Sequence, residues 1–198
     1  MNKLRLRKGL WALALLCAGA CAPATDEEAP AASQPIATAT PDASGALDVA
    51  TELELRNARM PMPGLITSGQ PTEEQFEALA AAGVSNFISL RPTTEDGAGW
   101  EESHAMPEGV GFTRLPISGA ASLTRENVEL FAAILEDAGD DATSLYCASS
   151  NRVGALLALK AYWIDGATPE EALSIGEDAG LSSLGAPVRE LMGLEPEG

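Results

Sequence analysis

A six-residue loop, Cys147-Ala148-Ser149-Ser150-Asn151-Arg152, stands between a short apolar run and a long apolar stretch. This order of strand, cysteine, small polar residues and arginine places a thiol and a guanidinium at one helix N-terminus. The first amides of a helix lack intrahelical acceptors and carry the positive end of the helix dipole, so they bind oxyanions. A cysteine that faces such amides is stabilised as a thiolate. Arg152 adds a planar fork of donors that fits two oxygens of a phosphoryl or sulfonyl group.

The four residues inside this loop have short side chains, so the backbone can curl around an anion. We therefore predict that Cys147 is a nucleophile and that the anion is bound by the residues that follow it: Ala148, Ser149, Ser150, Asn151 and Arg152. The alternative is a buried structural cysteine, because free cysteine is among the most buried residue types.

Short apolar runs alternate with amphipathic stretches over residues 51–198, which we predict to form one domain. The expected strands cover 62–68, 84–90, 112–117 and 143–146. The expected helices follow Thr72, Thr124, Arg152 and Thr168, with shorter ones near 100–106 and 188–192. This alternation predicts an α/β fold with a mostly parallel sheet flanked by helices. Such sheets carry their sites at the carboxyl ends of strands, where Cys147 is expected.

The N-terminus has the pattern of an export signal over residues 1–20. A basic stretch, Lys3 to Lys8, precedes an apolar stretch, Leu10 to Leu16, which is too short to span a bilayer of about 30 Å. Ala18-Gly19-Ala20-Cys21 resembles a bacterial lipobox, and it also fits an ordinary cleavage site. We expect export to the periplasm and a lipid anchor on Cys21, with Ala22 favouring the outer membrane.

Residues 21–50 are rich in alanine, proline, threonine and acids, which predicts a disordered tether after the lipidated cysteine. Cys17 would leave with the signal and Cys21 would carry lipid. Cys147 would then be a lone thiol in an oxidising compartment, which favours a function over packing alone.

The formal net charge of −17 argues against a nucleic-acid partner and against charge-driven adhesion to anionic lipid. Four of the twelve basic residues lie in the first eight positions, so eight remain for the rest of the chain. Arg152 is conspicuous among so few cations. The scarcity of histidine and cysteine argues against a metal site, and we expect no cofactor.

Phosphate ester hydrolysis benefits from an acid that protonates the leaving oxygen. Our preferred acid is Asp96, with Glu95 and Glu101 as further candidates in a segment rich in acids and glycine. A solvated acidic loop is the alternative. His104 is the only histidine, so a cysteine–histidine pair would require it.

Three segments together resemble a known family: Leu65 to Pro92, Leu115 to Gly119 and Tyr146 to Ala155. They are similar to the bacterial phosphatase-like domain of the beta-lactamase hydrolase-like proteins, a family related in fold to dual-specificity and tyrosine phosphatases. The resemblance covers about residues 60–181, and Ser68-Gly69-Gln70-Pro71 and the cysteine loop are its most specific parts. It implies a cysteine phosphatase fold in which Cys147 matches the nucleophile and Arg152 the phosphate-binding arginine.

The loop departs from the broader tyrosine phosphatase pattern in three ways. Tyr146 stands where that pattern has histidine, four residues rather than five separate Cys147 from Arg152, and Val153 stands where it has serine or threonine. The spacing of four is typical of rhodanese-like sulfurtransferases. Three functions therefore stay open: a phosphatase acting on a phosphorylated small molecule or a phosphoprotein, a sulfurtransferase, or a non-catalytic anion-binding module.

Overall fold

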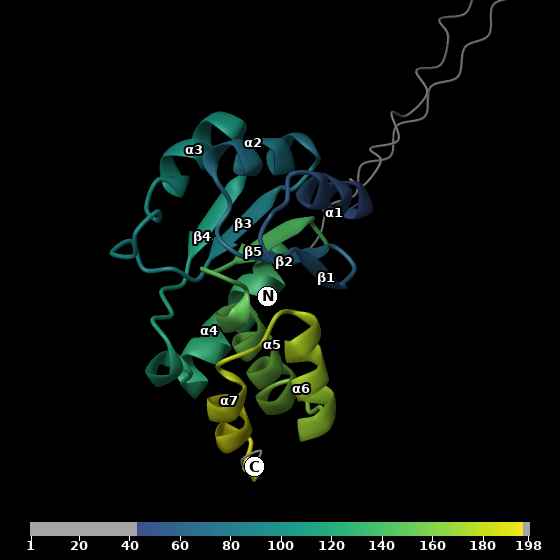
Figure 1. Cartoon of the computed structure of the whole chain (residues 1–198), viewed down its shortest axis with the longest axis vertical. Helices are drawn as coiled ribbons and strands as arrows, with labels where there is room; N and C mark the ends of the chain where they lie inside the picture. The colour runs from purple at the N-terminus through teal and green to yellow at the C-terminus, as the bar shows by residue number, and fades with distance from the viewer. Residues whose placement is uncertain (1–42, 196–198) are drawn as a thin grey trace, which may run out of the picture. The chain divides into compact units, whose positions relative to one another are not determined.

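The computed structural model describes residues 43–195, which contain a five-stranded sheet of order β1-β2-β5-β3-β4 (Figure 1). The strands are β1 (Arg59–Met62), β2 (Leu65–Ser68), β3 (Asn86–Ser89), β4 (Gly111–Arg114) and β5 (Thr143–Tyr146). Strands β2, β5, β3 and β4 are parallel to one another, and only the edge strand β1 is antiparallel to its neighbour. The predicted α/β fold with a mostly parallel sheet is confirmed.

Helices cover both faces of the sheet (Figure 1). One layer contains α1 (Ala43–Glu52), α2 (Glu73–Ala81) and α3 (Glu101–Glu108). The other contains α4 (Arg125–Ala138), α5 (Asn151–Trp163), α6 (Pro169–Asp178) and α7 (Gly185–Leu191), with a 3₁₀ turn, η1 (Ala120–Ser122), before α4. This arrangement buries β2, β5 and nearly all of β3 between two helical layers, as is usual for parallel strands, while the edge strand β4 stays partly exposed.

Successive strand residues pack into two different cores because side chains alternate across a sheet. Ile66 and Phe87 belong to the core shared with α1, α2 and α3, where Phe87 stacks on Phe76 with ring centroids 3.8 Å apart. Their neighbours Leu65 and Ile88 belong to the core shared with the other four helices. Strands with both faces buried carry adjacent apolar residues, such as Phe87-Ile88 in β3 and Leu65-Ile66 in β2, and these pairs made the strands predictable.

Helix α5 is the centre of the second layer and is buried along most of its length. Gly154 allows α6 to approach closely: a Cβ at this position would lie 2.3 Å from the amide nitrogen of Leu181 and 2.4 Å from the carbonyl oxygen of Gly176. This close packing fixes the helix whose first turn follows the cysteine loop.

The start of the domain differs from the prediction. We expected a tether over residues 21–50 and a domain from residue 51, but residues 43–52 form α1, and Ala46 and Ala50 are fully buried in the core. The four-residue spacing of these alanines places them on one helical face, a signal that the tether-like composition hides. Residues 21–42, and with them Cys21, lie outside the described residues.

Three predicted strands are shorter than expected. In the run 84–90, β3 covers only Asn86–Ser89. The run 62–68 is split by a turn at Pro63 and Gly64, where Gly64 has a φ of +82°, so β1 and β2 form a hairpin. Strand β4 ends at Arg114 rather than at residue 117, although the amide of Ile117 still donates to the carbonyl of Leu90 (2.9 Å). Pro116 has no amide proton, which prevents a regular ladder there.

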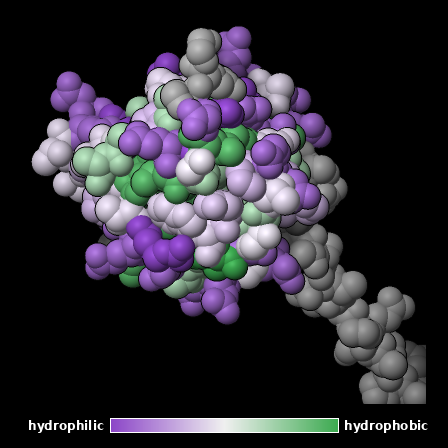
Figure 2. All heavy atoms as spheres, turned by 90° about the horizontal axis from the view of Figure 1, so that it is seen from below, coloured by the Kyte–Doolittle hydropathy of each residue, from purple (hydrophilic) through white to green (hydrophobic). Residues whose placement is uncertain are grey.

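The surface is mostly hydrophilic. Seen from the end formed by the second helical layer, apolar residues show as small patches between polar side chains (Figure 2). The large apolar side chains that stay exposed include Leu130, Ile164 and Leu191. Within residues 43–195, none of the helices has the length and apolar character needed to cross a membrane.

Candidate active site

Cys147 follows the last residue of β5, at the carboxyl end of the central strand of the sheet. Its amide donates to the carbonyl of Ser68 (3.3 Å), which ties the start of the loop to the end of β2. The side chain is buried, and its thiol is free of any disulfide. The predicted position of this cysteine, at a strand end just before a helix, agrees with the structure.

Ser150 precedes α5 in the left-handed region, with a φ of +68°, and its side chain does not cap the helix. Its hydroxyl instead donates to the carbonyl of Ala179 (2.7 Å). Gly180 makes room for this arrangement, because a Cβ there would lie 2.7 Å from Ser150 Cβ. The first amides of α5 therefore have neither an intrahelical acceptor nor a side-chain cap, the condition under which a helix N-terminus binds an anion.

A turn before β1 holds the cysteine loop from outside. Asn57 Nδ2 donates to the carbonyl of Ser149 (3.0 Å), and Arg56 Nη1 approaches the carbonyl of Ala148 (3.4 Å). In a trans peptide the C=O and the following N–H point in opposite directions. Fixing these two carbonyls therefore also fixes the amides of Ser149 and Ser150, which point away from the turn.

Arg152 is held by two acceptors. Its Nη1 and Nη2 donate to the two carboxylate oxygens of Glu95 (2.6 and 2.9 Å), and Nη1 also donates to the carbonyl of Ile117 (2.6 Å). The hydrogen bonds to Glu95 and the nearby Cys147 thiol raise the pKa of Arg152. Nε and the second Nη2 proton have no oxygen acceptor within residues 43–195, so this edge of the guanidinium can still hold an oxyanion.

Glu95 lies between two arginines, because Arg91 Nε donates to the same carboxylate (2.8 Å). The hydrogen bond from Arg152, with support from Arg91, lowers the pKa of Glu95 to about 2 despite partial burial. Glu95 is therefore a carboxylate at neutral pH. In this arrangement it orients Arg152 and has no proton to give to a leaving group.

The other predicted acid and base candidates lie elsewhere. Asp96 has an exposed side chain, and its backbone carbonyl accepts a hydrogen bond from Arg91 Nη2 (2.6 Å), so its role as a general acid stays a prediction. His104 lies on α3, where its Nε2 is 3.3 Å from a carboxylate oxygen of Glu73 and its ring contacts Trp100 edge-on.

Glu101 is fully buried and anchors a polar network behind the loop. It accepts hydrogen bonds from Arg114 Nη2 (2.8 Å) and from Gln70 Nε2 (3.2 Å). Gln70 in turn accepts a hydrogen bond from Arg91 Nη1 (3.0 Å). The chain of contacts therefore runs from Glu101 through Gln70 and Arg91 to Glu95, whose carboxylate holds the catalytic candidate Arg152.

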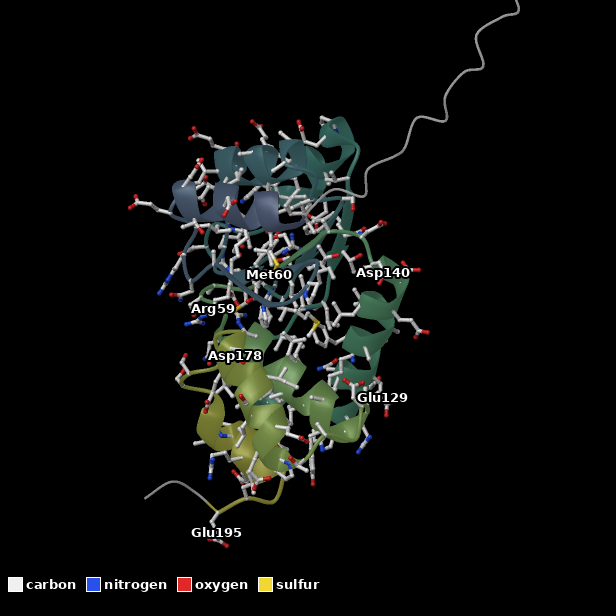
Figure 3. All side chains as sticks on the ribbon, turned by 90° about the vertical axis from the view of Figure 1, so that its right-hand side faces the viewer. Arg59, Met60, Glu129, Asp140, Asp178 and Glu195 are labelled. Carbon is white, nitrogen blue, oxygen red and sulfur yellow. The ribbon has the colours of Figure 1, made fainter. Side chains whose placement is uncertain are left out.

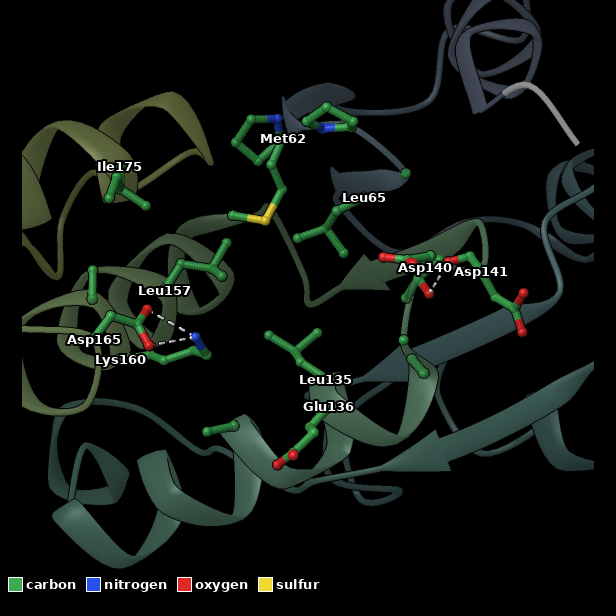
Figure 4. A pocket seen from close by; sticks show the side chains of 18 of the residues that line it. Met62, Leu65, Leu135, Glu136, Asp140, Asp141, Leu157, Lys160, Asp165 and Ile175 are labelled. Atoms are coloured by element: carbon green, nitrogen blue, oxygen red, sulfur yellow. Dashed lines mark hydrogen bonds and ion pairs between the residues drawn. The ribbon is translucent and has the colours of Figure 1, made fainter. Parts of the chain in front are cut away.

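A large cleft of about 1160 Å³ lies at the other end of the sheet (Figure 4). Its walls include Met62, Leu135 and Leu157, with Lys160 paired to Asp165 at one side. It opens where β2 and β5 begin, and neither Cys147 nor Arg152 lines it. Because parallel sheets carry their chemistry at the carboxyl ends of strands, we place the active site at the cysteine loop.

Sequence reasoning found the loop but missed the residues that hold it. Asn57 carried no motif, and Glu95 was considered only as an acid. Gln70 and Arg91 did carry a signal, since both follow strand ends in the segments that resemble the phosphatase-like family. Polar residues directly after parallel strands converge at one edge of the sheet, and that rule applied to Gln70 and Arg91 would have brought them to the site.

Comparison with solved structures identifies the fold. A candidate phosphatase of the DUF442 family from Shewanella putrefaciens superposes with a TM-score of 0.57 at 20% identity, covering 74% of this chain and 97% of that chain. A candidate phosphatase from Neisseria meningitidis gives 0.56 at 20% identity, covering 67% and 96%. The active form of Tk-PTP gives 0.52 at 16% identity, covering 68% and 95%.

No protein-family model matches the sequence, and no curated protein sequence matches it. Identities of 16–20% to the solved structures establish architecture rather than activity. All three superpositions cover at least two thirds of this chain and nearly the whole of each solved structure. The chain has the fold of the tyrosine-phosphatase-like cysteine phosphatases.

Proposed function

We propose that this protein is an exported cysteine-dependent phosphatase that hydrolyses phosphate monoesters through a phosphocysteine intermediate. One observation carries the proposal: a single loop brings Cys147 and Arg152 together at the uncapped N-terminus of α5. The narrower relationship to the beta-lactamase hydrolase-like proteins belongs to this proposal and rests on the segments 65–92, 115–119 and 146–155.

The geometry supports a two-step reaction. The Cys147 thiolate attacks phosphorus, a sulfur–phosphorus bond forms, the phosphorus–oxygen ester bond breaks, and the leaving oxygen takes a proton from solvent water. Water then attacks the phosphocysteine, which releases inorganic phosphate and restores the thiolate. The free edge of Arg152 and the first amides of α5 would hold the non-bridging oxygens, where negative charge is concentrated in both steps.

Leaving-group protonation is the step with least support. The loop 118–122 contains no acid, and Glu95 is committed to Arg152 as a carboxylate. A general acid is worth about 10² to 10⁴ in rate, so the enzyme would favour substrates with good leaving groups unless Asp96 moves toward the thiol.

The test is hydrolysis of an aryl phosphate, whose leaving group needs little protonation. We expect turnover by the reduced wild-type protein and none by Cys147→Ser or Arg152→Ala. Circular dichroism spectra should show that all three proteins are folded. Turnover that survives Cys147→Ser would overturn the proposal. The protein should begin before Ala43, because removing α1 would open the core at Ala46 and Ala50.

The missing acid favours a second candidate, a non-catalytic anion-binding module. Such a module would bind phosphate or sulfate at the loop without turnover. The spacing of four residues between Cys147 and Arg152 still allows a sulfurtransferase, which would turn over thiosulfate and carry a persulfide on Cys147. The same three proteins distinguish these outcomes in one set of assays.

Export and lipidation at Cys21 complete the proposal and rest on residues 1–22. We expect the protein in a bacterial host to sediment with membranes, and Cys21→Ala to release it. Equal membrane association of both proteins would argue against a lipid anchor.

A further inference from the structure

The few cations of this chain gather at one end of the sheet. Eight basic residues follow position 21 in a protein whose net charge is −17. Five of them lie beside the cysteine loop or at the carboxyl ends of the strands: Arg56, Arg59, Arg91, Arg114 and Arg152. Arg91, Arg114 and Arg152 are each paired with a glutamate.

Arg56 and Arg59 differ from those three because both are exposed and neither makes an ion pair with an acid of residues 43–195. Cations far from the loop do find partners: the exposed Arg125 lies 3.8 Å from Glu129, and the half-buried Lys160 lies 2.8 Å from Asp165. In a protein with 29 acidic residues, two arginines that flank the cysteine loop without an acidic partner are an unusual concentration of positive charge.

Arg56 places its guanidinium at the rim of the loop. Its Nη1 lies 3.4 Å from the carbonyl oxygen of Ala148, and this contact uses only one of its five donor protons. Its aliphatic stem crosses Gly69, where a Cβ would lie 3.0 Å from Arg56 Cβ and 3.2 Å from Arg56 Cδ. Any side chain at position 69 would push the guanidinium away from the loop.

Arg59 flanks the same loop from its other side. The position that a Cβ on Gly180 would occupy is 2.7 Å from Arg59 Nη1 and 2.7 Å from Ser150 Cβ, so both side chains contact this glycine. Arg59 lies at the edge of the molecule away from Asp140, which borders the large cleft (Figure 3). The two unpaired arginines therefore share the end of the sheet that carries Cys147.

We propose that Arg56 and Arg59 form a second anion subsite, and that the substrate carries a second anionic group, a phosphate or a carboxylate, besides the phosphate bound at Cys147. The inference rests on the proposed function and specifies its substrate class. The acidic surface repels polyanions generally. Two guanidinium groups without acidic partners beside the loop would therefore select the anions that dock in the correct orientation. Arg56 also contacts the loop, so its removal affects binding of a single phosphate as well. The diagnostic quantity is therefore the affinity for a bifunctional anion divided by the affinity for a matched anion with one phosphonate.

The experiment uses the full chain and non-hydrolysable probes. Alkyl bisphosphonates of increasing length, phosphonocarboxylates and chain-matched monophosphonates compete against alkylation of Cys147 by iodoacetamide, which is followed by mass spectrometry of the Cys147 peptide. We expect at least one bifunctional probe to bind about tenfold more tightly than its monophosphonate, equivalent to about 1.4 kcal/mol. The tightest-binding probe class identifies the second anionic group as phosphate or carboxylate. The alkyl length of that probe gives the distance between the two anionic groups.

We expect the ratio of bifunctional-probe affinity to monophosphonate affinity to fall to near one in the double variant Arg56→Ala, Arg59→Ala. The control Arg125→Ala should keep the wild-type ratio. A wild-type ratio of one, or a ratio that the double variant retains, overturns the subsite. If the protein hydrolyses aryl phosphate but binds bifunctional probes no more tightly than monophosphonates, the subsite alone is contradicted. If it prefers a bifunctional probe but hydrolyses no aryl phosphate, the phosphatase activity alone is contradicted. Absence of protection by every probe would overturn both.

Discussion

Helices α5 and α6 begin in opposite ways. At α6, Thr168 Oγ1 accepts from the amide of Glu171 (3.3 Å), Glu171 Oε2 accepts from the amide of Thr168 (2.9 Å), and Pro169 fills the first turn. At α5, Ser150 is left-handed and turns its hydroxyl away to Ala179. The side chains at the start of α6 cap its first amides, whereas those of α5 have no side-chain cap.

The two helix starts contribute differently to the stability of the fold. A capping box stabilises a helix by about 0.5–2 kcal/mol, whereas a non-glycine residue in the left-handed region costs of order 1–3 kcal/mol. A chain selected for stability alone would begin α5 as it begins α6. The costly start of α5 is the one to which we assign the chemistry.

The largest effect should come from Arg152→Lys. Lysine keeps the charge but loses the planar fork, so it cannot bind Glu95 and an oxyanion at once. We expect kcat/KM for an aryl phosphate to fall by about 10²–10³, the range for removing one transition-state donor. A fall of less than threefold would show that the α5 terminus works without its arginine.

Glu95→Gln should weaken the same terminus less, by about tenfold in kcat/KM, because Arg152 loses a charged hydrogen-bond partner. It should also change acid stability. The pKa of Glu95 is lowered from 4.5 to about 2, so its stabilising contribution is complete above pH 4.5 and is lost as the pH falls toward about 2. Thermal unfolding from pH 6 to 2.5 should show a shallower acid decline in the variant than in wild type.

Asn57→Gly sharpens the comparison by loosening the support of the loop. Asn57 and Glu54 both have positive φ, 54° and 51°, but only Asn57 bonds the loop. Glycine relieves either backbone equally, so Glu54→Gly is the matched control. We expect phosphate affinity to fall about threefold to tenfold in Asn57→Gly, as for one lost hydrogen bond, and to stay unchanged in the control. Equal phosphate affinities of Asn57→Gly and Glu54→Gly would show that Asn57 does not support the loop.

Thr168→Ala should have the smallest effect on function. It removes the cap of α6, so the free energy of unfolding should fall by about 1 kcal/mol in urea titrations. Its kcat/KM should match wild type, since no contact links Thr168 to the cysteine loop among the hydrogen bonds of residues 43–195. A loss of activity without loss of stability would contradict the division between the two helices.

Sequence reasoning worked where one local pattern decides the structure. The helix starts after Thr72 and Thr168, the strands and the position of Cys147 all follow from short-range chemistry. It failed where distant segments meet. Asn57 and Ser149 are 92 positions apart, and Glu95 reaches Arg152 across 57. Such contacts depend on how the strands assemble, which residue spacing alone does not specify.

The most direct test is to trap the intermediate. Wild-type protein is mixed with an aryl phosphate and quenched in acid within one turnover, and the Cys147 peptide is analysed by mass spectrometry. We expect the mass of one phosphoryl group on Cys147 in wild type and none in Arg152→Ala. Turnover that continues while Cys147 stays unmodified at every quench time would contradict a phosphocysteine intermediate.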